Sequence, residues 1–393
     1  MRRLPKLFSF TVFTYASAMA VAADPVHTAV PAPAGEVREV CFVLDTTGSM
    51  SGLIDGAKRR IWGIVNELTV AESGKPRPRL RIGLVAYRDR GDGYITQVTD
   101  LNDDLDAIWL KLSALRADGG GDTPESVNQA LSDAVAKVTW SKDKTTMKTI
   151  FLVGDAPPHM DYANDVKYPL ICTQAVTNGI VINALLCGAD PTAMGIWQDI
   201  AKRSEGRYVG IPQDGGVKQQ ETPFDAAIGK LNSDLAATAL AYGDRKQRDE
   251  VSAKVAAQAA APVATSADRA ENFARNRTDA GADPTAAPVI SGKGELINDL
   301  VTNKVDLDKV SATDLPSEFQ GLKKEEIAAK IAERQQKRIE LGKQLDAQLT
   351  ERTKWLREQT AAKPATGKDG FDAQVAEMVK VQAARMNANP AAP

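Results

Sequence analysis

Two kinds of hydrophobic pattern alternate over residues 37–242. Short, continuous apolar runs rich in β-branched residues predict strands buried on both faces. Stretches with apolar residues every three or four positions predict amphipathic helices. The runs lie at residues 40–44, 80–87, 149–154, 180–187 and 207–211, and the helical stretches at residues 53–68, 103–115, 126–138, 168–178, 192–204 and 224–241. This alternation predicts an α/β fold: a doubly wound, mainly parallel sheet with helices on both faces.

One further strand is expected to run antiparallel to its neighbour. Residues 94–101 follow the second apolar run directly, across the turn Gly91-Asp92-Gly93. A tight turn between two such runs is typical of a β-hairpin. We therefore expect one antiparallel edge on an otherwise parallel sheet.

The pattern changes beyond residue 242. Residues 243–293 are rich in Ala, Asp, Arg and Pro; their first part is expected to extend the closing helix and the remainder to form a flexible linker. Residues 294–393 are expected to form a charged, mostly helical C-terminal extension, with a long helix over residues 323–359 and a last short helix over residues 371–386. The apolar stripe of the first is narrow and gapped: Ile327, Ile331, Ile339, Leu345, Leu349 and Leu356. Such a stripe predicts a helical hairpin or a weak coiled coil, through which the chain could self-associate.

The first 36 residues predict export. Basic residues at positions 2, 3 and 6 precede a mostly apolar run at 7–22, and the small residues Val21-Ala22-Ala23 fit a signal-peptidase site. Residues 1–23 are thus expected to be a signal peptide cleaved near Ala23, and residues 24–36 a short leader. An uncleaved anchor is the alternative, although the apolar run is short for a membrane span. We expect a periplasmic or secreted protein.

Charge and cysteine content add two expectations. The chain has 393 residues, a formal net charge of −2 and a pI near 5.9, so nothing suggests a nucleic-acid partner. An exported protein can hold disulfides, and Cys172 and Cys187 are both expected at the same end of the sheet. A bridge closing this loop of about 15 residues would contribute about 3 kcal/mol, and two free thiols are the alternative.

The first strand leads into a loop of oxygen donors. Asp45, Thr47 and Ser49 follow the apolar run at 40–44. In open α/β sheets, ligands bind at the carboxyl ends of the strands. A carboxylate with two hydroxyls suits a hard divalent cation, Mg²⁺ or otherwise Mn²⁺ or Ca²⁺. The alternative is that these hydroxyl residues only cap the following helix.

Two other loops are expected to reach the same edge. Asp155 ends the apolar run at 149–154, and Glu125 lies in GGGDTPES, just before a predicted helix. Asp-x-Thr-x-Ser at Asp45, Thr47 and Ser49, together with Asp155, resembles the metal-ion-dependent adhesion site of von Willebrand factor type A domains. The resemblance covers residues 37–242. It implies a sheet with helices on both sides and a metal site built from three loops.

The second loop departs from the commonest pattern of that family, which supplies a Thr. GGGDTPES looks instead like the Asp-Ser-Pro-Glu version of integrin β-subunit domains. The resemblance therefore implies Glu125 as the metal ligand, with Thr123 as the alternative. Asp122 would cap a helix or serve a neighbouring calcium-type site.

Further polar residues are expected on the rim around this site. Arg88, Asp89, Arg90 and Asp92 follow the second strand, and His159 follows Asp155. With Asp122, they are candidates for a partner-binding surface. The alternatives are solvated charges in a turn and a surface turn histidine.

These expectations lead to a functional hypothesis. The family resemblance implies that a partner's Asp or Glu carboxylate completes the coordination of the cation. We therefore expect a metal-dependent, non-enzymatic protein-binding module of the cell envelope, similar to exported bacterial proteins of this family. The alternatives are a hydrolase that uses the metal to activate water, and a structural envelope protein with a vestigial metal site.

Overall fold

The computed structural model describes residues 36–70, 75–214, 216, 221–279, 288–362 and 371–388. The expected signal peptide, its cleavage site and the leader up to residue 35 lie outside the described residues. Export therefore stays a prediction. None of the described helices combines the length and the apolar character needed to cross a membrane.

Six strands form one sheet in the order β3-β2-β1-β4-β5-β6. Their bounds are β1 (Val37–Asp45), β2 (Arg79–Tyr87), β3 (Thr96–Asn102), β4 (Met147–Gly154), β5 (Ile180–Cys187) and β6 (Tyr208–Ile211). All neighbouring pairs are parallel except β2 and β3, which are antiparallel. The predicted fold class and the predicted antiparallel edge are confirmed.

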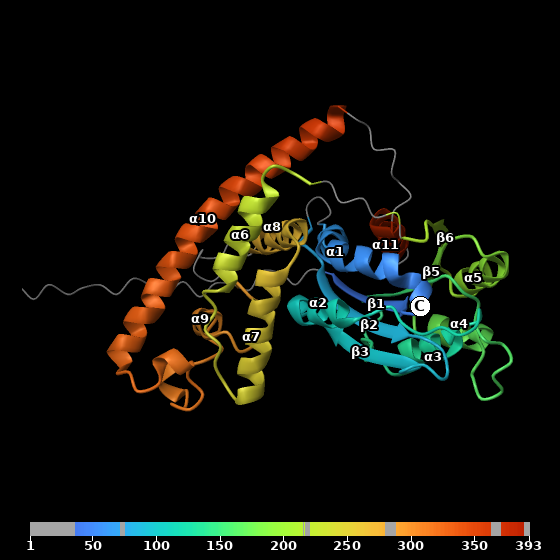
Figure 1. Ribbon diagram of the computed structural model, residues 1–393, viewed down its shortest axis with the longest axis horizontal. Helices are drawn as coiled ribbons and strands as arrows, with labels where there is room; N and C mark the ends of the chain where they lie inside the picture. The colour runs from blue at the N-terminus through green and yellow to red at the C-terminus, as the bar shows by residue number, and fades with distance from the viewer. Residues whose placement is uncertain are drawn as a thin grey trace, which may run out of the picture. The chain divides into compact units, whose positions relative to one another are not determined.

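Helices cover both faces of the sheet (Figure 1). One face packs against α1 (Ser51–Leu68), α2 (Leu105–Ala114) and α11 (Phe371–Ala388), and the other against α3 (Val127–Ala136), α4 (Tyr168–Thr177) and α5 (Pro191–Arg203). Side chains of a strand alternate between faces, so in β1 Phe42 faces α1 whereas Val43 faces α3 and α4. Burial of both sets explains why the strands are continuous apolar runs.

The region expected as a linker is largely helical. After α6 (Asp225–Ala236), residues form α7 (Arg245–Ala260), α8 (Val263–Asp279) and α9 (Leu296–Val301). Helix α8 packs through small residues such as Ala267 and Ala270, both fully buried, and through buried polar side chains such as Arg269. Because alanines and paired charges replace large apolar residues, this helix is polar on average, although its apolar residues lie on one face. The linker expectation for residues 263–279 was wrong.

The apolar stripe of α10 (Lys324–Ala362) is covered within the chain. Ile327 and Ile331 pack with α9 and Phe319, and Leu345 and Leu349 pack with α6 and α8. Two buried arginines reinforce the docking: Arg338 pairs with Glu295, and Arg352 pairs with Asp225, Asp268 and Glu271. Among the described helices, α10 therefore packs against shorter helices rather than in a long coiled coil.

The three cysteines are buried and free, so the expected disulfide between Cys172 and Cys187 is wrong. Cys187 shares its side of β5 with Leu185 and packs on the α1 face, whereas Cys172 on α4 packs on the opposite face. The sheet separates the two thiols. Cys172 instead donates to the carbonyl of Ile200, at 3.7 Å.

Candidate metal centre

The topology brings the loops that follow three neighbouring strands to one edge of the sheet. Strands β2, β1 and β4 are adjacent and parallel. Asp45 is the last residue of β1, Asp155 follows β4 directly, and Asp89 comes shortly after β2. Carboxyl ends of parallel strands lie at the same edge, so these side chains share it.

The two carboxylate oxygens of Asp45 differ in their hydrogen bonds. Its side chain is fully buried. Oδ1 accepts hydrogen bonds from the amide of Thr47 (2.9 Å) and from its hydroxyl (2.7 Å), and that hydroxyl lies 3.3 Å from Ser49 Oγ. Oδ2 is buried and accepts no hydrogen bond of ordinary geometry from the described residues, although the hydroxyl of Tyr87 is close enough to lower the pKa of Asp45. Burial raises the pKa of Asp45 to about 7, against the Thr47 hydrogen bonds, and the charge of Asp155 adds to the rise.

Gly154, at the end of β4, is required beside Asp45. A Cβ at this position would lie 3.1 Å from Asp45 Oδ2 and would collide with the hydroxyl of Tyr87. Tyr87, the last residue of β2, is also fully buried. Only glycine therefore leaves room for both side chains at this edge.

Glu125 enters the same space from the second loop. Its side chain is buried, and Oε2 has no hydrogen-bond partner in the described part of the chain. A Cβ on Gly120 (φ +81°) would lie 3.2 Å from both Glu125 Oε1 and Thr47 Cβ, so the two side chains converge at this glycine. Burial, together with the charges of Asp45, Asp89, Asp92 and Asp155, raises the pKa of Glu125 to about 9. Thr123, the alternative residue of this loop, is exposed.

Backbone hydrogen bonds fix the second loop to the loop after β4. The amide of Glu125 donates to the carbonyl of Pro157 (2.9 Å), and the amide of His159 donates to the carbonyl of Glu125 (3.1 Å). Asp155 itself is half-buried, and its Oδ2 accepts a hydrogen bond from Gln213 Nε2 at 2.7 Å. Gln213 follows β6, so a fourth loop contributes to the site.

The donor set fits a hard divalent cation. Asp45, Glu125 and Asp155 supply carboxylate oxygens, Thr47 and Ser49 supply hydroxyls, and no described Lys or Arg forms an ion pair with these carboxylates. Buried, unpaired carboxylates are costly, and a cation is the usual compensation. The three carboxylates do not meet within 4.8 Å of one another in the described part of the chain. A cation here would therefore also need the hydroxyls and water as ligands, as Mg²⁺ commonly does.

Two of the rim residues are engaged inside the chain. The guanidinium of Arg88 is buried; it donates to the carbonyl of Arg116 (2.8 Å) and lies over the ring of Tyr94 (4.5 Å). Asp92 accepts a hydrogen bond from the amide of Gly120 at 3.1 Å, and so supports the loop that carries Glu125. Both residues therefore support the loop between α2 and α3 through hydrogen bonds to its backbone.

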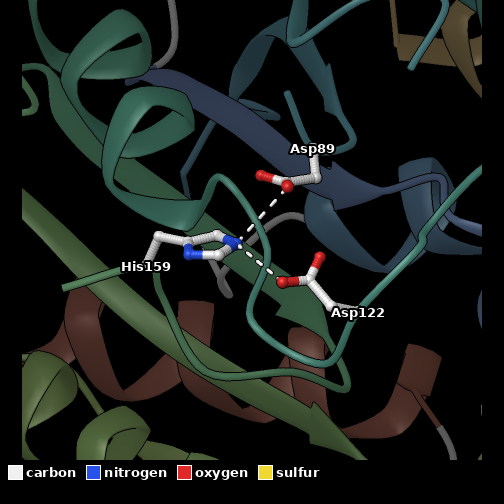
Figure 2. A group of neighbouring side chains, drawn as sticks. All are labelled: Asp89, Asp122 and His159. Atoms are coloured by element: carbon white, nitrogen blue, oxygen red, sulfur yellow. Dashed lines mark ion pairs between the residues drawn. The ribbon is translucent and has the colours of Figure 1, made fainter. Parts of the chain in front are cut away.

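Asp89, Asp122 and His159 form a separate cluster, shown in Figure 2. His159 Nε2 lies 3.3 Å from Asp89 Oδ2 and 3.8 Å from Asp122 Oδ2. His159 is only 4% exposed, so the surface-turn alternative is wrong for it, whereas Asp122 is exposed. Arg90 lies over the ring of Tyr162 and pairs with Asp165.

Residues 39–211 match the family model described as von Willebrand factor A domain. We refer to this part of the chain, which matches that family model, as the von Willebrand factor A (VWA) domain. A von Willebrand factor A domain-containing protein 7 from Rattus norvegicus is 36% identical over 117 residues, 30% of this chain and 12% of that protein. The human protein of that name is 34% identical over the same length, with the same shares covered. The chain thus spans only a small part of the length of these relatives.

Other matches extend over similar lengths. The putative ariadne-like RING finger protein R811 of Acanthamoeba polyphaga mimivirus is 29% identical over 123 residues, 31% of this chain and 11% of that protein. Among solved structures, the VWA domain of SpRpn10 is 16% identical, with a TM-score of 0.34, over 47% of this chain and 90% of that one. Proximal thread matrix protein 1 of the mussel byssus, solved with a zinc-occupied MIDAS motif, is 15% identical, with a TM-score of 0.36, over 46% and 43%.

Sequence reasoning missed several residues at this edge of the VWA domain. Tyr87 read only as the end of an apolar strand, and Gln213 lay in a loop with no recognisable motif. Gly154 gave a signal that could have been used, since a glycine between a buried strand and an aspartate often marks a close approach to another group. The pairing of His159 with Asp89 gave none, because it depends on side-chain directions in two separate loops.

Proposed function

We propose that the VWA domain binds a protein partner through a divalent cation held by Asp45, Thr47, Ser49, Glu125 and Asp155. A hard cation bound there would accept a partner's Asp or Glu carboxylate as an additional ligand. In this proposal the domain is a binding module and has no catalytic role. Mg²⁺ is the proposed ion, with Mn²⁺ and Ca²⁺ as alternatives of the same oxygen-preferring class.

One observation carries the proposal. Asp45 Oδ2 and Glu125 Oε2 are both buried, and among the described residues neither accepts a hydrogen bond of ordinary geometry, although the hydroxyl of Tyr87 interacts with Asp45. Desolvation, with repulsion from neighbouring carboxylates, raises the pKa of Asp45 to about 7 and that of Glu125 to about 9. Perturbed carboxylates at the ligand-binding edge of an α/β sheet are typical of functional sites. A cation would offset the repulsion that the protein alone leaves uncompensated.

The same observation supports Glu125 over Thr123 as the second-loop ligand. Glu125 is buried beside Thr47, whereas Thr123 is exposed. Thr47 would act in two ways: its amide and hydroxyl hold Asp45 Oδ1, so that Oδ2 is left for the ion or for its bound water. Gln213 would orient Asp155 by donating to its Oδ2.

Calorimetric titration of the full chain with MgCl₂ and MnCl₂ tests cation binding. We expect one site in this region, lost in Asp45→Asn and weakened at least tenfold in Glu125→Gln, with Thr123→Ala close to the parent chain. Asp234→Asn is the matched control, because Asp234 is an aspartate on α6 that pairs with exposed Lys230. Equal affinity in Asp45→Asn and the parent chain would refute the proposed ligand set.

Affinity capture tests the partner. Proteins retained by the immobilised chain in Mg²⁺ should be released by EDTA and should not be retained by Asp45→Asn, while Asp234→Asn retains them. An identical retained set for Asp45→Asn and the parent chain would overturn the binding role even if the cation binds.

A further inference from the structure

We propose that Asp89, Asp122 and His159 form a second cation site, distinct from the oxygen-only site beside Asp45. Two carboxylates with an imidazole are a mixed oxygen and nitrogen ligand set. Imidazole suits Zn²⁺ and related transition metals, whereas Mg²⁺ and Ca²⁺ prefer oxygen. The cluster is therefore a site for Zn²⁺ or a related transition metal on the same rim.

The distances suit a small tetrahedral ion. The three ligand atoms, one from each residue, lie within 4.8 Å of one another. His159 Nε2 is 3.3 Å from Asp89 Oδ2 and 3.8 Å from Asp122 Oδ2 (Figure 2). Zinc bonds of about 2.0–2.1 Å in a tetrahedron separate neighbouring ligand atoms by roughly 3.4 Å. His159 and Asp89 already have this spacing, and the exposed side chain of Asp122 needs only a small shift to reach it.

His159 points to a bound ligand independently of the acidic residues. Its Nε2 is buried and has no hydrogen-bond partner among the described residues. Its Nδ1 lies 2.8 Å from Asp161 Oδ1. A neutral imidazole donates through one nitrogen only. If Nδ1 donates to Asp161, the lone pair of Nε2 faces two carboxylates, and this arrangement needs a positive charge between them.

The surroundings match those of metal-binding histidines. Such histidines generally donate their other ring N–H to a carboxylate, and the ligating carboxylates are themselves hydrogen-bonded. Asp161 takes the first role. For the second, Asp89 Oδ1 accepts from Ser126 Oγ and Asp89 Oδ2 from the hydroxyl of Tyr162, both at 2.8 Å.

Ring packing further fixes the imidazole. Tyr162 stacks on His159 with ring centroids 3.9 Å apart and an interplanar angle of 10°. The guanidinium of Arg90 lies on the ring of Tyr162, 4.0 Å from its centroid. Two of the three ligands, Asp89 and His159, are thus held in place before any ion binds. Asp122 comes from the loop that carries Glu125, so an ion here would order the loop that contributes to the first site.

The competing explanation is a proton. An imidazolium could bridge Asp89 and Asp161 without any metal. The two explanations differ in one measurable respect: a proton-bridged cluster has no affinity for zinc beyond that of ordinary surface residues.

Zinc titration of the full chain in excess Mg²⁺ distinguishes them. After EDTA treatment and dialysis, ZnCl₂ is titrated against a chromophoric chelator, in the parent chain and in Asp45→Asn. We expect one Zn²⁺ per chain in both, with affinity reduced at least tenfold by His159→Gln and by Asp122→Asn. His27→Gln is the matched control, because His27 is the only other histidine in the sequence.

Several outcomes decide between the two sites. Zinc binding that survives in Asp45→Asn but not in His159→Gln supports this proposal whether or not the first site is correct. Co²⁺ should give visible absorption that His159→Gln changes and Asp45→Asn does not. Asp122→Asn guards against misfolding, because Asp122 is exposed. Absence of zinc binding in excess Mg²⁺, or binding unchanged in His159→Gln, would overturn the proposal and leave the proton-bridged cluster.

Discussion

The guanidinium of Arg269 donates two hydrogen bonds of 2.8 Å to the two carboxylate oxygens of Asp106. Both side chains are buried. Arg269 lies on α8 and Asp106 on α2, so this pair joins the C-terminal helices to the VWA domain. Arg269 also donates to Asn232 Oδ1 and to the carbonyl of Val289. In this buried network each charge has a partner, whereas neither α2 nor α8 alone could bury its charged side chain.

Removing one partner of this pair should be strongly destabilising. Arg269→Met leaves the Asp106 carboxylate buried without its cation, which typically costs about 3–5 kcal/mol of unfolding free energy. Lys230→Met is the control: Lys230 is exposed and pairs with Asp234 across one helical turn, an interaction worth at most about 1 kcal/mol. Urea denaturation measures both. Equal effects of the two substitutions would show that the buried pair is not a main link between the elements.

Stability without metal should depend on pH through Asp45. The folded protein holds the proton of Asp45 with a pKa of about 7, raised from 3.8 mainly by burial. The folded state therefore binds this proton more tightly than the unfolded state, and unfolding free energy falls as pH rises from about 4 to 7. Glu125 acts in the same direction, from 4.5 to about 9. Melting in EDTA across pH 5–8 should show this fall, reduced in Asp45→Asn.

A cation competes with those protons, so its effect should have the opposite pH dependence. The rise in melting temperature caused by saturating Mg²⁺ should increase from pH 5 to pH 8, because the carboxylates are then free to bind. Asp45→Asn should lose most of this rise. A Mg²⁺ effect that is constant over this range would contradict the proposed ligands.

The cysteines offer a direct chemical check. Since all three are buried and free, three thiols should react with a thiol reagent in denaturant without any reductant. In the folded state the reaction should be slow, because burial raises the pKa of Cys172 to about 12 and the pKa values of the other two thiols as well. Dithiothreitol should leave the melting temperature unchanged. A count of one thiol would instead indicate a disulfide.

Helix α11 should be essential to the core. Val375 is fully buried against the sheet and α1, with Met378, Val379 and Ala383 beside it. Val375→Asp places an unpaired charge in this layer and should cost about 4 kcal/mol or more. Ala384→Asp, on the exposed side of the same helix, should change stability by less than about 0.5 kcal/mol. Equal melting temperatures for the two variants would show that α11 is only loosely attached.

An element could be predicted from the sequence where its own apolar residues show the period of a strand or a helix. Strand β5 has the predicted bounds, residues 180–187, because both faces of it are apolar. Helix α8 was missed because alanines and the paired Arg269 provide its contacts, and these leave its composition as polar on average as that of a linker. The disulfide prediction was wrong for a different reason. The order of the elements placed Cys172 and Cys187 at the same end of the sheet, but it did not show that they lie on opposite faces of it.

The candidate site, too, could be predicted only in part from the sequence. The order of the elements sufficed to bring Asp45, Asp155 and the loop of Glu125 to one edge, since the two aspartates end parallel strands and Glu125 precedes a helix. Burial of His159 did not follow from sequence, because it depends on how the loop after β4 folds back onto the loop of Glu125. Contacts of Gln213 with Asp155 likewise require a turn whose path no periodicity encodes.

The hydrogen bond of 2.6 Å between Thr149 on β4 and Gln382 on α11 joins residues 233 positions apart. At synthesis rates of about 5–20 residues per second, β4 leaves the ribosome roughly 10–50 s before its partner helix. During that interval the apolar surface that α11 later covers stays exposed to solvent and can associate with other chains. The nascent chain should therefore depend on holdase chaperones until α11 is synthesised, and early chain termination should yield aggregates rather than a smaller working protein.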